Sequence, residues 1–188
     1  MTEALYKQQL LNNLYNKWTL EQIPLESAAT QIVFGHGNAA SPLMIIGEAP
    51  GQQEDAQGKP FVGRSGQLLS KALVQAGIAR DQVFITNTVK CRPPGNRTPT
   101  PQEIAFFKTT FLDPEIKIIQ PKIILTLGAV ALNALTESAP PISKARGIAI
   151  KTASGLIIPT YHPAYILRNP PAYELFLEDI KAAAAHLI

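Results

Sequence analysis

The sequence predicts an α/β fold in which a parallel β-sheet is covered by helices on both faces. Three short apolar runs rich in β-branched residues, at 43–47, 83–87 and 122–128, alternate with segments of helical periodicity. Continuous apolar runs of this length are typical of strands that are buried on both faces. Because no linker, repeat or low-complexity segment divides the chain, we expect a single domain over residues 1–188.

Hydrophobic periodicity and capping residues locate the helices. The clearest start is at Thr100, which is followed by Pro101 at the first helical position and by Glu103 three residues after the cap. Two apolar runs joined by a Gly-containing turn, at 148–151 and 156–160, predict a hairpin. Helices are predicted at residues 3–17, 65–78, from 101 onward, 129–138 and 170–188.

Composition excludes several classes of protein. The 17 Lys and Arg against 14 Asp and Glu leave a formal charge of +3, which permits a polyanionic partner without requiring one. The single cysteine, Cys91, excludes an intramolecular disulfide and any four-cysteine zinc or iron–sulfur site. No apolar run approaches the ~18 residues of a membrane span, and the N-terminal residues lack a signal-peptide pattern. We therefore expect a cytoplasmic protein without membrane association, with a monomer as the default state.

Most of the unusual polar and glycine residues fall in three loops that follow predicted strands. In open α/β sheets, ligands bind beyond the carboxyl ends of the strands. These loops, at residues 48–64, 87–97 and 162–168, should therefore meet at one edge of the sheet. The sequence carries no metal-binding histidine motif, phosphate-binding loop, dinucleotide fingerprint or nucleophile elbow.

The first loop reads GEAPGQQEDAQGKPFVGRSG. Glu48 follows the strand directly, where a carboxylate is able to orient water, and Phe61 offers a flat ring to a planar base. Gly47, Gly51 and Gly63 allow a backbone to pass close to a ligand. The structural alternative is a tight turn with a solvated acid and a core phenylalanine, because glycines and prolines alone are weak evidence.

The second and third loops add an amide, basic side chains and a histidine. Asn87 ends an apolar strand, and its amide both donates and accepts, which suits the edge of a pyrimidine. Lys90, Arg92 and Arg97 are able to neutralise phosphates. His162 follows the last strand and is able to stabilise negative charge on a leaving group. The alternatives are a proline-stiffened surface loop and a structural histidine.

Taken together, the motifs GEAPG–x2–ED–x2–GKPFVGRSGQLL, TN–x–VKCRPPGNRTP and HPAYILR resemble those of family 4 of the uracil-DNA glycosylase superfamily. The resemblance runs from about residue 35 to the terminal helix. It implies a three-layer α/β/α sandwich around a four-stranded parallel sheet. It also implies a DNA-repair enzyme that flips uracil, and by extension other deaminated bases, out of DNA and hydrolyses the N-glycosidic bond.

The resemblance also implies roles for individual residues. Glu48 matches the acid that positions water and base, Phe61 the stacking aromatic, Asn87 the amide that reads the uracil edge, and His162 the histidine beside the base carbonyl. Ala49 stands where the best-known branch of the superfamily has a catalytic Asp, so no strong general base is assigned. The pocket backbone is matched by Gly47, Ala49, Pro50 and Gly51. The expected phosphate contacts are Arg64, Lys90, Arg92, Arg97 and Arg168.

The chain departs from family 4 at the iron–sulfur site. Members of that family hold a [4Fe–4S] cluster with four cysteines, of which only Cys91 is present. By spacing, the others fall on Leu20, Ile23 and Phe107. We therefore expect no cofactor, and we expect these three side chains to form an apolar plug near Cys91 together with Trp18.

Two alternatives to an active glycosylase remain from the sequence. Loss of three cluster ligands keeps open a catalytically weak or inactive DNA-binding protein on the same fold. An α/β protein that binds a small nucleotide is the third reading, although three basic residues in the proline loop argue against it. The sequence does not identify protein partners.

Overall fold

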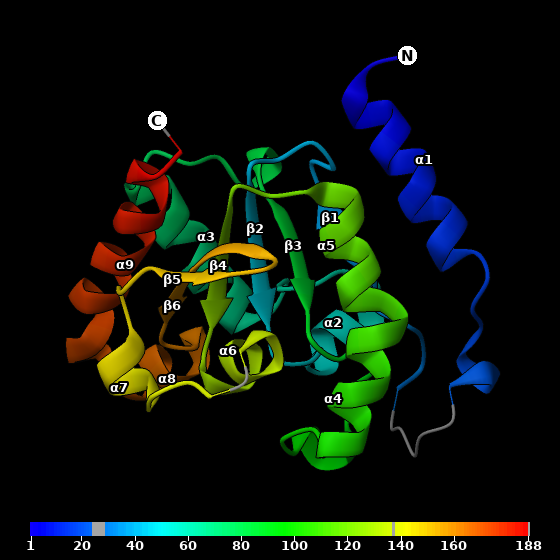
Figure 1. The fold of residues 1–188 in the computed structure, drawn as a ribbon. Helices are drawn as coiled ribbons and strands as arrows, with labels where there is room; N and C mark the ends of the chain where they lie inside the picture. Colours follow the sequence, from blue (N-terminus) through cyan, green and yellow to red (C-terminus); the bar gives the residue numbers. More distant parts are fainter. Residues whose placement is uncertain (24–28, 137, 188) are drawn as a thin grey trace.

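The computed structural model describes residues 1–23, 29–136 and 138–187 and is built around one sheet with strand order β1-β3-β2-β4-β6-β5 (Figure 1). The four inner strands are parallel, and the two edge strands, β1 and β5, pair antiparallel with their neighbours. The strands are β1 (His36–Gly37), β2 (Leu43–Gly47), β3 (Phe84–Asn87), β4 (Ile123–Leu127), β5 (Ile150–Thr152) and β6 (Gly155–Thr160).

The four parallel strands confirm the predicted centre of the fold. Every residue of β2, β3 and β4 is buried, as the continuous apolar runs indicated. The predicted hairpin is present as β5 and β6. The antiparallel edge strand β1 was not expected, since two residues are too few to give a periodic signal.

Helices cover both faces of the sheet and complete the three layers (Figure 1). Side chains of α1, α4, α5 and α6 contribute to the core on one face, and those of α3, α8 and α9 to the core on the other. Within the described residues, no helix combines the length and apolarity needed to cross a membrane. The helices are α1 (Glu3–Tyr15), α2 (Gln52–Gln57), α3 (Arg64–Gln75), α4 (Pro101–Phe107), α5 (Asp113–Ile119), α6 (Ala129–Leu135), α7 (Ile142–Ala145), α8 (Pro163–Arg168) and α9 (Tyr173–Ala185).

The start of α4 shows how local sequence sets these boundaries. Thr100 Oγ1 accepts a hydrogen bond from the Glu103 backbone N–H at 3.2 Å, and the Glu103 carboxylate accepts one from the Thr100 N–H at 2.6 Å. This is the capping box expected from the sequence. The helix then continues through a wider π-helical turn (Lys108–Leu112) into α5. The loop expected at residues 48–64 differs, because it contains the short helix α2.

An apolar plug joins the N-terminal segment to the loop after β3. Ile23, Cys91 and Phe107 are buried in one hydrophobic cluster, and Leu20 and Trp18 pack against it. The Phe107 ring is 1% exposed, which leaves no room for a ligand at this position. The prediction that these side chains share one packed region is therefore confirmed.

We expect Phe107→Ala to lower the free energy of unfolding by about 3–5 kcal/mol, because it opens a cavity in a fully packed site. The neighbouring Phe106 is only partly buried, so Phe106→Ala is the matched control and should cost clearly less. Equilibrium urea unfolding measures both changes. Equal losses for the two variants would contradict a plug centred on Phe107.

Candidate active site

A pocket of about 470 Å³ lies where the three loops meet beyond the parallel strands. It unites residues that are far apart in the chain, because β2, β3 and β6 run in the same direction and end at the same edge (Figure 1). Its lining includes seven residues that the sequence nominated for catalysis or base binding: Glu48, Ala49, Pro50, Gly51, Phe61, Asn87 and His162.

Gly47 forms the point of closest approach between the first two loops. A Cβ at this position would lie 2.4 Å from Phe61 Cζ and 2.5 Å from Asn87 Oδ1, so a larger residue would displace the ring and the amide. Its carbonyl accepts two hydrogen bonds from Thr88, one from the backbone N–H and one from the hydroxyl, each 2.9 Å long. Gly47 therefore lies directly against both the ring and the amide of the pocket.

Phe61 is held with its ring in the pocket by an unusual backbone conformation. Its φ is +53°, in the left-handed region that costs a non-glycine residue roughly 1–3 kcal/mol. Gly66 makes this possible, since a Cβ there would lie only 1.8 Å from the Phe61 carbonyl oxygen. The ring centroid lies 6.0 Å from that of His162, so an aromatic wall and a hydrogen-bonding side chain share one pocket.

Asn87 carries a buried acceptor, its side-chain Oδ1, that lacks a donor among the described residues. The residue is 2% exposed, and no described residue donates a hydrogen bond to its Oδ1. Leaving a buried acceptor unpaired costs about 1–3 kcal/mol. Because the side chain lines the pocket, the oxygen is available to an N–H donor on a ligand.

His162 is prepared to donate a hydrogen bond as a neutral imidazole. It caps α8, and its Nδ1 accepts from the Ala164 backbone N–H at 3.1 Å, so the proton of the neutral ring is on Nε2. Burial, followed by the positive charge of Arg168, lowers the pKa of His162 to about 4, and Glu54 partly opposes this. At neutral pH the ring is therefore uncharged.

Glu48 is the acid nearest the end of β2. Burial raises the pKa of its carboxyl group above the ordinary value. Its backbone carbonyl accepts from the Val89 N–H at 3.0 Å, which ties the first loop to the second. Its neighbour Ala49 contributes no acid, as the sequence indicated.

Glu54 was not nominated from the sequence, yet it organises the first loop. Its carboxylate accepts hydrogen bonds from the backbone N–H groups of Gly51, Val62 and Gly63, at 3.2, 2.9 and 2.8 Å. These bonds hold the chain on both sides of Phe61. The signal was present in the spacing, because an acid three residues after an N-cap position is typical of a capping box.

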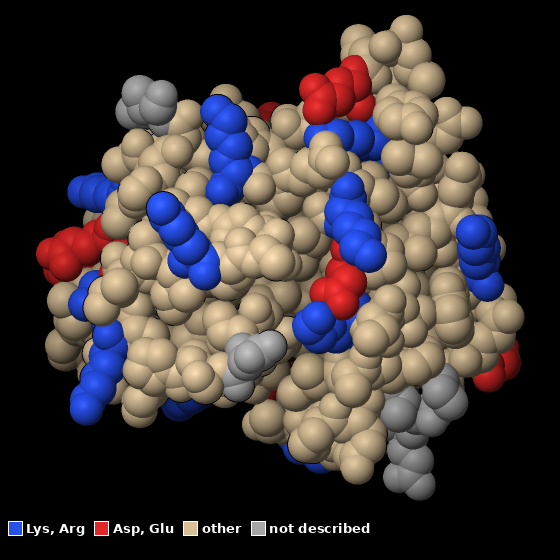
Figure 2. Space-filling view, in the orientation of Figure 1, with Lys and Arg blue, Asp and Glu red and all other residues tan. Residues whose placement is uncertain are grey.

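The expected phosphate contacts divide into two groups. Arg97 and Arg168 line the pocket, and Arg97 also forms a two-pronged ion pair with Glu103 at 2.8 Å. Arg64 is exposed at the start of α3, and Arg92 donates to Asn96 at 2.7 Å. On the face seen in Figure 2, Lys and Arg side chains are spread singly over the surface and form no continuous basic track.

The expectation for Lys90 is wrong. Its side chain is fully buried, and its ammonium group is paired with Glu115 at 2.6 Å. A phosphate cannot reach it in this structure. The charge pattern alone could not reveal this, because the partner acid lies 25 residues further along the chain.

Comparisons with known proteins identify the family of this chain. The chain belongs to the uracil DNA glycosylase superfamily, whose family model matches residues 34–185. It is 45% identical over 168 residues to a type-4 uracil-DNA glycosylase of Thermotoga maritima, with 87% of each chain covered. It is 44% identical over 161 residues to that of Sulfurisphaera tokodaii, covering 81% of this chain and 73% of the relative. A type-5 uracil-DNA glycosylase of Pyrobaculum aerophilum is 29% identical over 168 residues, with 79% and 74% covered.

The residues of this chain do not fit the four-cysteine cluster that family 4 implies. Burial, with a smaller effect of Asp55, raises the pKa of the Cys91 thiol to about 12, whereas a cluster ligand must be a thiolate. The other three positions are hydrophobic and packed. In the part of the chain that the structure describes, no three His, Cys, Asp or Glu side chains gather to hold a metal ion.

The pKa of His162 gives a testable pH dependence. The unfolded chain takes up a proton near the ordinary histidine pKa of about 6.5, whereas the native ring does so only near pH 4. Stability should therefore fall by about 2–3 kcal/mol as the pH drops from about 6.5 to about 4, and this component should be absent in His162→Gln. NMR titration of the ring gives the pKa directly. A value near 6.5 would contradict the lowered pKa of the ring.

Proposed function

We propose that this protein is a uracil-DNA glycosylase that removes uracil flipped out of DNA. The observation that carries the proposal is the unpaired Asn87 oxygen, which lies in one pocket with the Phe61 ring and the neutral His162. Each of the three matches a different property of uracil: an N–H donor, a flat face and a carbonyl that becomes negative.

Recognition follows from the Asn87 amide. Its oxygen accepts the uracil N3–H, and its nitrogen donates to the O4 carbonyl. Cytosine presents an acceptor at N3 and a donor at C4, so the same amide opposes it. Hypoxanthine also has an N–H beside a carbonyl, which makes it the deaminated purine to test. Stacking on Phe61 offsets the few kcal/mol needed to flip the base.

The chemistry requires charge stabilisation more than a strong base. When the bond between C1′ and N1 breaks, its electron pair stays on uracil, and negative charge develops on O2. His162 Nε2–H is the donor for that oxygen, because Nδ1 already accepts from the Ala164 N–H and fixes the ring. Water then adds its hydroxyl to C1′, and its proton is released to the departing base or to solvent. Glu48 orients this water and stabilises the cationic sugar.

Excision is tested with a uracil-containing oligonucleotide, single- or double-stranded, that is treated with alkali after incubation. We expect scission at uracil with the wild type, and losses of about 10²–10³-fold for His162→Ala, which removes the donor to O2. Asn87→Ala should lose activity and discriminate less between uracil and cytosine. Glu48→Ala should be slower by about 10²-fold.

The control for these variants is Gln75→Ala, an exposed change on α3 that should leave the rate unaltered. Binding without scission would instead support the alternative of an inactive DNA-binding protein. Normal excision by Glu48→Ala would remove Glu48 from the mechanism.

We also propose that the enzyme works without an iron–sulfur cluster. Metal analysis of protein purified under anaerobic conditions should find no stoichiometric iron, and its visible spectrum should lack cluster absorbance. Cys91→Ala should then retain wild-type excision, because the thiol only fills space in the core. Bound iron, or a loss of iron in Cys91→Ala, would overturn this proposal.

A further inference from the structure

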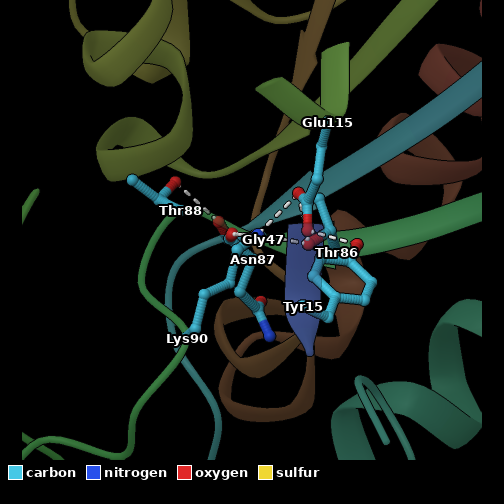
Figure 3. A network of polar contacts seen from close by, with 7 residues as sticks. All are labelled: Tyr15, Gly47, Thr86, Asn87, Thr88, Lys90 and Glu115. Atoms are coloured by element: carbon cyan, nitrogen blue, oxygen red, sulfur yellow. Dashed lines mark hydrogen bonds and ion pairs between the residues drawn. The ribbon is translucent and has the colours of Figure 1, made fainter. Parts of the chain in front are cut away.

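Lys90 lies at the centre of a buried polar network beneath the pocket (Figure 3). Its ammonium group donates to Thr86 Oγ1 at 2.5 Å, to the Asn87 backbone carbonyl at 2.7 Å and to Glu115 Oε2 at 2.6 Å. A lysine has three N–H donors. All three are used inside the protein, and one of them holds the residue that faces the base.

Glu115 is the counter-charge of Lys90, and both of its carboxylate oxygens accept hydrogen bonds. Its Oε1 accepts from the Tyr15 hydroxyl at 2.7 Å, and its Oε2 accepts from Thr86 Oγ1 at 3.0 Å as well as from Lys90. Both charged side chains are fully buried, so water does not compete for these bonds. Helices α1 and α5 thereby fix the position of the Lys90 ammonium group.

The network contacts Asn87 at the point where the sheet ends. Asn87 is the last residue of β3 and pairs with Gly47 of β2. The next residue, Thr88, is fixed by its hydroxyl to the Gly47 carbonyl. The Asn87 peptide is therefore held from two sides, while its side-chain amide points away from the ion pair (Figure 3). Reading a base edge requires the amide to be held within about 0.5 Å.

We propose that Lys90 is a positioning residue, which holds the Asn87 carbonyl so that the Asn87 amide is fixed for base recognition, with Glu115 as its counter-charge. The proposal rests on the proposed glycosylase activity. Replacing the ion pair by an apolar side chain fills the same space but leaves the Asn87 carbonyl without its donor. A buried ion pair adds little net stability over such packing, so its effect here is on geometry.

The test is a double-mutant cycle on uracil excision. Lys90→Met alone leaves the Glu115 carboxylate buried and unpaired, so it is combined with Glu115→Gln, which keeps an acceptor for Tyr15. We expect the excision rate constant of the Lys90→Met/Glu115→Gln double variant to be about 10–100-fold lower than that of the wild type. KM should change less than about 3-fold. In an Asn87→Ala background, the same pair should change the rate less than about 2-fold, because no amide remains to be positioned.

A destabilised protein without a positioning defect is the matched control. Ile180→Val lies in the core on the opposite face of the sheet and should reduce stability while leaving the rate unchanged. Equal losses from the Lys90→Met/Glu115→Gln pair in the wild-type and Asn87→Ala backgrounds would overturn the proposal. They would leave the glycosylase function itself intact.

A second measurement does not depend on activity. The side-chain amide of Asn87 is followed by ¹⁵N NMR in the ligand-free protein and is assigned by its loss in Asn87→Ala. We expect one sharp pair of resonances in the wild type, and broadened or doubled resonances after the Lys90→Met/Glu115→Gln change. Unchanged resonances would overturn the proposal. If the wild type removes no uracil, the proposed function fails, and this measurement still decides the role of Lys90.

Discussion

The pocket depends on a close approach at Gly47, where the end of β2 touches the Phe61 ring and the Asn87 amide at once. The parallel register places Gly47 beside Asn87, and a side chain at position 47 would push the two apart. The backbone conformation of Phe61 depends in turn on Gly66. The conformation of the loop around Phe61 depends on the hydrogen bonds that Glu54 accepts. The flat wall of the pocket is therefore positioned by backbone packing, and the same packing orients the Asn87 amide.

Much of this arrangement could be predicted from the sequence, because strand ends are easy to locate. Glu48, Asn87 and His162 follow apolar runs, and parallel strands bring such positions to one edge. Lys90 was misassigned for a physical reason: a lysine in a proline-rich loop resembles a surface charge until its tertiary partner is known. The antiparallel strand β1 and the bonds that Glu54 makes to Val62 and Gly63 also depend on tertiary contacts, which no local pattern records.

Two adjacent buried residues of the second loop, Lys90 and Cys91, are stabilised by different interactions. At Lys90, the ammonium group is paired with Glu115 and also donates to the Asn87 backbone carbonyl. These bonds fix the position of that carbonyl. At Cys91, one residue later, the surroundings are apolar, and Ile23 and Phe107 fill the space without directional bonds. Directional contacts thus lie next to the Asn87 amide, while nondirectional packing surrounds Cys91 and Ile23.

Attachment by apolar packing has a temperature dependence that a metal crosslink lacks. Burial of apolar surface is driven near room temperature by the entropy of water, and it weakens on cooling. The contact of Leu20 and Ile23 with the region around Phe107 should therefore be strongest in warm solution and loosen in the cold. The heat capacity of apolar burial thus sets how the contact of Leu20 and Ile23 with the Phe107 region responds to temperature.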